Sequence, residues 1–229
     1  AICEGYIDNV NVKLNDWPLI KNTLYDDSIL LDLLNMKAGD QKWVGERMKN
    51  GSDNRIKGPK NENVNVIGLM KVMNEYLRGS EKSKLIYNYS ALTTNVIMNY
   101  VKYKTNGDWE KLLHKVFNEH VGVKNSVYFS KSKKYLKTDF VSGRYSFYAN
   151  RYDYLRIAKT IMDDWHNDTC AGKYLKTIYK NRVKKKDGTK EPDDVGLYTK
   201  TYGGQFHFDI FGLKKTRKII GMSGFAGQQ

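Results

Sequence analysis

Apolar residues follow a helical period directly after Tyr89, in the middle of the chain. The recurring residues are Leu92, Val96, Ile97, Tyr100 and Val101. This spacing places them on one face and predicts an amphipathic helix. Ser90 precedes the run and is a suitable N-cap, because its hydroxyl can accept from a free backbone N–H of the first turn. Tyr89 would then stand at the positive end of the helix dipole, which favours a phenolate over a phenol.

The same period predicts further helices on both sides of this one. They cover about residues 28–36, 66–77, 108–117, 150–165 and 172–178. Asp27 or Ser28 would cap the first, and Gly39 would end it. The helix that begins at Asn150 has its own apolar face. That face consists of Leu155, Ala158, Ile161, Met162 and Trp165.

The pattern changes to a period of two from Tyr202 onward. Phe206, Phe208 and Ile210 alternate with the polar residues Gln205, His207 and Asp209. A turn near 212–216 leads to a second run over 218–222, so the pattern predicts an antiparallel β-hairpin. A short strand is also expected near 127–129. Helices followed by a terminal hairpin indicate an α+β fold. We expect one domain over 1–229, with a helical lobe at about 1–180 and the hairpin at about 198–229.

Composition limits the class of protein further. A chain of 229 residues with 40% hydrophobic residues can bury a core, and its apolar runs are too short to predict a transmembrane segment. The two cysteines, Cys3 and Cys170, are too few and too far apart to imply a disulfide framework. They could pair only if the fold brought them together, and two buried thiols are the expectation.

Four stretches of the sequence resemble one superfamily, in the same order. They are Ile86–Val101 around Tyr89-Ser90, Ser28–Gly39, Tyr148–Arg156, and the pair Tyr202–Phe206 and Gly221–Gln228. They are similar to the Tyr-x-Asn region, two helix starts and the glycine-rich strands of serine β-lactamases, penicillin-binding proteins and serine esterases. The resemblance is to the branch of class C β-lactamases, family VIII-type esterases and 6-aminohexanoate-dimer hydrolases.

This resemblance implies a helical lobe packed on an antiparallel sheet, with an acyl-transfer site at their junction. Tyr89 would relay protons, and Ser223 and Gly224 would lie on the strand that borders the substrate and the oxyanion hole. The substrate would be a small ester, amide, β-lactam or peptide-like molecule. No cofactor or metal is implied, and no nucleic-acid partner is expected. Members of the family are often exported, which favours the periplasm as the location of this protein.

The sequence departs from the family pattern at three places. Ala91 stands where Tyr-x-Asn has its asparagine, and Met222 stands where the strand motif has a cation, which favours an esterase or amidase over a penicillinase. The nucleophile of the family belongs to a Ser-x-x-Lys helix, which would precede residue 1. Ser130–Lys133 matches that pattern, but it lies in a polar stretch where each lysine would be hydrated and charged. We therefore interpret the chain as a piece of a serine hydrolase, without a nucleophile and inactive alone.

The net charge of +14 supports a competing interpretation. A basic chain often binds nucleic acid or another anionic polymer, and lysines gather at 131–137 and 184–186. The excess is nearly all lysine and is scattered, whereas nucleic-acid sites favour arginine. The four histidines are spaced too irregularly for a metal site, and His207 is expected on the exposed face of its strand, with a place in the cleft as the alternative.

Overall fold

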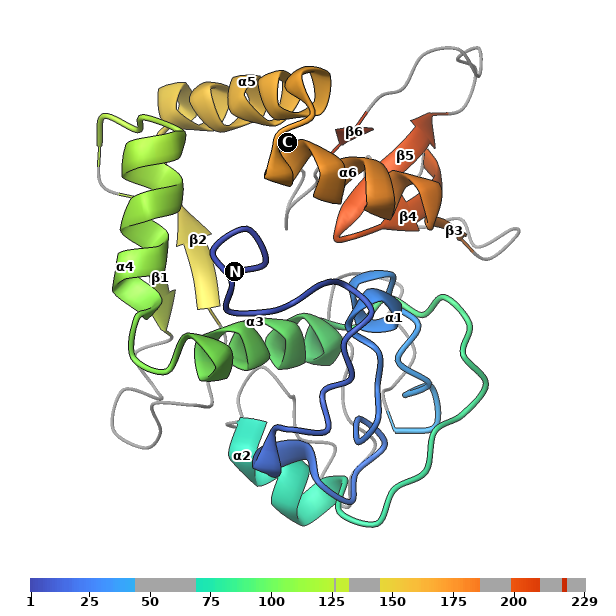
Figure 1. Ribbon diagram of the computed structural model, residues 1–229. Helices are drawn as coiled ribbons and strands as arrows, with labels where there is room; N and C mark the ends of the chain where they lie inside the picture. Colours follow the sequence, from blue (N-terminus) through green and yellow to red (C-terminus); the bar gives the residue numbers. More distant parts are fainter. Residues whose placement is uncertain (44–68, 126, 132–144, 186–198, 211–219, 222–229) are drawn as a thin grey trace.

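The computed structural model describes residues 1–43, 69–125, 127–131, 145–185, 199–210 and 220–221 (Figure 1). The α-helices are α1 (Leu30–Leu34), α2 (Leu69–Lys71), α3 (Ala91–Thr105), α4 (Trp109–Leu113), α5 (Arg151–Asn167) and α6 (Cys170–Lys180). A 3-10 turn, η1 (Pro18–Ile20), precedes them, and π-helical turns extend two of them, η2 (Val72–Tyr76) after α2 and η3 (His114–His120) after α4. None of the helices that the structure describes is long and apolar enough to span a membrane.

The strands form two antiparallel groups, so the predicted α+β class is confirmed. β1 (Tyr128–Lys131) pairs with β2 (Tyr145–Tyr148). The second sheet has the order β3-β4-β5-β6, with β3 (Val183–Lys184), β4 (Thr199–Gly203), β5 (Phe206–Ile210) and β6 (Ile220–Gly221). The predicted pairing of the 206–210 run with the next strand is present, since His207 lies opposite Gly221. β3 and the first residues of β4 were not predicted from the sequence.

The main core joins the N-terminal segment to α1, η2 and α3 (Figure 1). Trp17, Tyr25 and Tyr100 are among its largest fully buried side chains. α3 begins as predicted, and it ends at Asn106, which has a left-handed backbone (φ 45°) and is followed by Gly107 (φ 98°). That ending is typical of helix C-termini, because asparagine and glycine tolerate positive φ. The cap of α1 differs from the prediction: the N-cap is Ile29, without a side-chain bond.

The turn between β4 and β5 attaches the sheet to this core. Asn35 follows α1, and its amide donates to the carbonyl of Asn181 and accepts from the N–H of Gly204. The N–H of Gln205 donates to the carbonyl of Leu34 at 3.1 Å. The hydroxyl of Thr94 on α3 donates to the side chain of Gln205 at 3.1 Å. The end of α1, the start of α3 and the β4–β5 turn are therefore fixed relative to one another.

The packing of α5 agrees with its sequence pattern only at Ile161 and Trp165, which are partly buried against α6 and β5. Leu155 and Met162 of the predicted apolar face are 66% and 60% exposed, whereas Asp153 and Asp164 are buried. Asp153 is buried because it accepts hydrogen bonds from the backbone of the 124–125 loop at 2.9 and 3.1 Å. These bonds hold the pKa of Asp153 down at about 2, with the Lys124 N–H as the largest cause. Hydrogen bonds to Asp153, together with the contacts of Ile161 and Trp165 against α6 and β5, thus decide which side of α5 faces inward.

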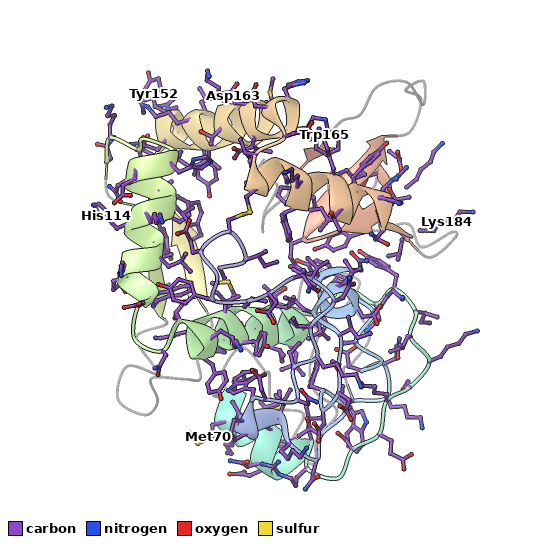
Figure 2. All side chains as sticks on the ribbon, viewed as in Figure 1. Met70, His114, Tyr152, Asp163, Trp165 and Lys184 are labelled. Carbon is purple, nitrogen blue, oxygen red and sulfur yellow. A yellow bond between two sulfur atoms is a disulfide. The ribbon has the colours of Figure 1, made fainter. Side chains whose placement is uncertain are left out.

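A disulfide joins Cys3 to Cys170, and the expectation of two buried thiols is wrong (Figure 2). The bond ties the N-terminal segment to the first residue of α6, and both residues are exposed. The two cysteines lie 167 residues apart in sequence. The turn of the N-terminal segment and the placement of α6 bring their Cα atoms to 5.7 Å, a contact that spacing alone could not reveal.

Candidate active site

Tyr89 lies where an extended segment enters α3, as predicted. Ser90 is the N-cap, with extended backbone, and its side chain accepts from the N–H of Thr93 at 3.4 Å. Ser90 is fully buried, whereas Tyr89 is half-buried. Ala91 is the first residue of the helix. The local geometry needed to hold a phenol at a helix N-terminus is therefore present.

Tyr89 belongs to an aromatic cluster that connects α3 to the sheet. Its ring meets that of Tyr202 on β4 edge to face, with centroids 6.2 Å apart. Tyr87 lies against the same ring at 5.5 Å, and His207 on β5 at 5.0 Å. Met36, which follows α1, packs in the same cluster. Tyr202 thus contacts both His207 on β5 and the two tyrosines that precede α3.

His207 does not occupy the exposed strand face expected for it. It is only 9% exposed, and its Nδ1 lies 3.3 Å from the hydroxyl of Thr199. Phe208, its neighbour in β5, is fully buried against α6. Both faces of β5 are therefore covered at this point, one by the tyrosine cluster and the other by α6. The two-residue period identified the strand but not the burial of its polar face.

A buried carboxylate, Asp40, lies beside the start of α3 and was not identified from the sequence. Its Oδ1 accepts from the amide of Asn88 at 3.2 Å. Its Oδ2 accepts from the hydroxyls of Thr93 at 3.2 Å and Tyr25 at 3.3 Å. Burial raises the pKa of Asp40, and hydrogen bonds from Asn88, Ser90 and Thr93 oppose that rise. Burial also raises the pKa of the Tyr25 phenol, and the nearby Asp40 charge adds to the effect.

The structure brings three of the four resembled segments together around Tyr89. Segment 28–39 reaches it through Met36, whose carbonyl accepts from the N–H of Asn88 at 2.8 Å. Segment 202–206 reaches it through Tyr202 and through the bond between Thr94 and Gln205. Segment 148–156 lies elsewhere, at the start of α5, which packs on α6.

The other candidate residues fall at several places. Ser223, Gly224 and Met222 lie outside the described residues, although Gly221 on β6 pairs with His207. Ser130 lies on strand β1 opposite Ser146, so the Ser-x-x-Lys match does not begin on a helix.

The part of the chain that the structure describes holds no group of three metal-ligating side chains among His, Cys, Asp and Glu. His114 pairs with Glu119 at 3.2 Å, and His120 pairs with Asp164 at 2.9 Å. Of the two lysine clusters, the described ranges include Lys131 of the first and Lys184 and Lys185 of the second, and the remaining residues lie outside them.

Comparison of the chain with protein-family models, with curated proteins and with solved structures finds no match in any of the three.

Proposed function

We propose that this chain is part of a serine hydrolase related to the serine β-lactamases and penicillin-binding proteins, acting on ester, amide or β-lactam bonds. Tyr89 is its proton relay. Ser223 and Gly224 border the substrate and the oxyanion hole. No residue of this chain is proposed as the nucleophile, so the 229 residues alone are expected to be inactive. A Ser-x-x-Lys pair from elsewhere in the protein completes the site.

The convergence of three resembled segments on Tyr89 supports this proposal. The segments are far apart in the sequence, and nothing in their local patterns requires them to meet. In the resembled superfamily the site lies where the helical lobe meets the sheet. Tyr89 directly precedes α3 and contacts the strand residue Tyr202, with ring centroids 6.2 Å apart, and this position supports the proposal.

The chemistry places two demands on the site, and the first concerns Tyr89. A phenol has an ordinary pKa near 10, so a relay role at neutral pH needs nearby groups that favour the phenolate. The N-terminus of α3 supplies the positive end of a helix dipole. The lysine of the proposed Ser-x-x-Lys pair would supply a cation. The oxyanion of the acyl intermediate would need backbone N–H donors, which a glycine-containing strand can present closely.

The direct test uses the protein expressed from its complete reading frame. We expect a fluorophosphonate probe to label one serine, preceding Ala1 and followed three residues later by lysine. Tyr89→Phe should lower kcat for a p-nitrophenyl ester by about a hundredfold, in the range seen when a general acid–base group is removed. Tyr152→Phe is the matched control, because Tyr152 is 66% exposed on α5 (Figure 2) and should leave kcat unchanged.

Two results would contradict the proposal. One is a reading frame without Ser-x-x-Lys ahead of Ala1. The other is labelling of a serine within the 229 residues, which would reassign the nucleophile. A comparison of ester with β-lactam hydrolysis then addresses the substrate class. We expect the ester to be the better substrate, because Met222 replaces the cation of the family's strand motif.

A further inference from the structure

Asp40 is a fully buried carboxylate with no part in the proposed proton relay. Burying a carboxylate is unfavourable unless several donors compensate it. Three side chains donate to Asp40, at 3.2 to 3.3 Å: those of Asn88, Thr93 and Tyr25. A charged acceptor makes stronger hydrogen bonds than a neutral one. The carboxylate therefore fixes its donors more firmly than an amide or a hydroxyl could.

The donors of Asp40 lie on both sides of Tyr89 in the chain. Asn88 comes immediately before it, and Thr93 lies in the first turn of α3. The Ser90 hydroxyl, immediately after Tyr89, also bonds to the carboxylate. The backbone N–H of Asn88 is held separately by the carbonyl of Met36 at 2.8 Å. Asp40 thus ties the segment that precedes α3 to the start of the helix, with Tyr89 between the two tied points.

We propose that Asp40 is the positioning residue for Tyr89, holding it at the start of α3 in front of the acyl-transfer site. The catalytic part of this inference rests on the proposed hydrolase function, whereas the structural part does not. Each carboxylate oxygen serves a different side: Oδ1 holds Asn88, and Oδ2 holds Thr93 and Tyr25. An amide at position 40 would present a donor to one of these sides and would remove the charge, so that side would keep only weaker, neutral hydrogen bonds.

The structural test follows the ring of Tyr89 directly. In protein labelled with 13C-tyrosine, Tyr89→Phe identifies the Tyr89 resonance. We expect Asp40→Asn to shift or split that resonance and to speed amide exchange over residues 89–94 about tenfold. Asp153→Asn is the control, because Asp153 is another fully buried carboxylate that accepts from a loop and from the side chain of the N-cap residue Asn150, but on α5. It should leave the Tyr89 resonance unchanged.

A pair of Thr93 variants keeps the test decisive if Asp40→Asn fails to fold. Thr93→Ser retains the hydroxyl that donates to Asp40, and Thr93→Val removes it at similar volume. The serine variant should resemble the wild type, and the valine variant should perturb Tyr89. An unperturbed Tyr89 resonance in Asp40→Asn, or in Thr93→Val where Asp40→Asn does not fold, overturns the inference.

The catalytic test measures kcat and KM on an ester substrate with the protein from the complete reading frame. A displaced relay lowers the rate of the chemical step more than substrate binding. We expect Asp40→Asn to lower kcat between about tenfold and a hundredfold, with KM changed less than about twofold. An unchanged kcat beside a shifted Tyr89 resonance overturns the catalytic part. If the wild type hydrolyses nothing, the proposed function fails, and the resonance of Tyr89 still decides the role of Asp40.

Discussion

Removal of the disulfide between Cys3 and Cys170 should destabilise the protein strongly. The bond closes a loop across 167 residues of sequence, in a chain of 229. In the chain-entropy account, a cross-link of that span restricts the unfolded state by about 5 kcal/mol. Noncovalent contacts at the same end, such as the pairing of Lys115 with Glu4 and the bond of Tyr6 to Asp108 at 3.1 Å, are exposed and contribute much less.

The expected size of the effect can be stated as a melting temperature. For a protein of this length, 1 kcal/mol corresponds to a shift of about 2–4 °C. The Cys3→Ser/Cys170→Ser variant should therefore melt about 10–20 °C below the wild type, followed by circular dichroism. Because both cysteines are exposed, a reductant should lower the melting temperature of the wild type to nearly the same value. The reductant should not affect the double variant, which makes that variant its own control.

A decrease of less than about 4 °C would refute the reasoning, since it corresponds to roughly 1–2 kcal/mol. A thiol assay separates the two explanations of such a result. Two free thiols in the untreated wild type would mean that the bond does not form. No free thiols would mean that the unfolded chain is already compact, so the cross-link restricts it little.

Three further predictions address packing, acid stability and binding. Gly172→Ala should lower the free energy of unfolding in urea by about 1–3 kcal/mol, because the added Cβ would lie 1.8 Å from the carbonyl oxygen of Asp164. Lys173→Ala, on the same helix, should be nearly neutral. Hydrogen bonds, chiefly from the Lys124 N–H, hold the pKa of Asp153 at about 2. The ionised carboxylate therefore stabilises the fold above pH 4, and this stabilisation is lost as the pH falls towards 2. In a pH series, the melting temperature of Asp153→Asn should decline less steeply than that of the wild type. Equal decline in both proteins would contradict that assignment. Binding of the chain to single-stranded DNA should be weak at 150 mM salt, and tight binding with a steep salt dependence would favour the competing interpretation as a polyanion-binding module.

Local patterns predicted the elements around the candidate site well. Ser90 and the apolar period after it were sufficient for α3, because an N-cap and a helical stripe act within a few residues. Alternation over 206–210 was sufficient for β5, whose pairing with β6 needs only a short connection. For the same reason the position of Tyr89 at the mouth of a helix could be predicted from its neighbours alone.

Other features of the site depend on segments that are distant in sequence. Nothing around Asp40 shows that its donors, Asn88, Thr93 and Tyr25, would surround it. The burial of His207 depends on Tyr202, which packs against its ring, and on the position of Thr199 beside it. A polar residue on an alternating strand is ordinarily exposed, and only the packing of two faces shows otherwise.

The sequence by itself determined where α3 starts, which tyrosine precedes it and which strand alternates, because short-range hydrogen bonds and side-chain periodicity decide these features. The tertiary structure alone decided that Cys3 bonds to Cys170, that Asp153 and Asp164 of α5 are buried and that Asp40 bonds to Asn88 and Thr93, on either side of Tyr89 in the chain. The Asp40–Asn88 bond joins residues 48 positions apart, and the disulfide joins residues 167 positions apart. Their free energy comes from burial and from the packing of distant segments, which no local pattern contains.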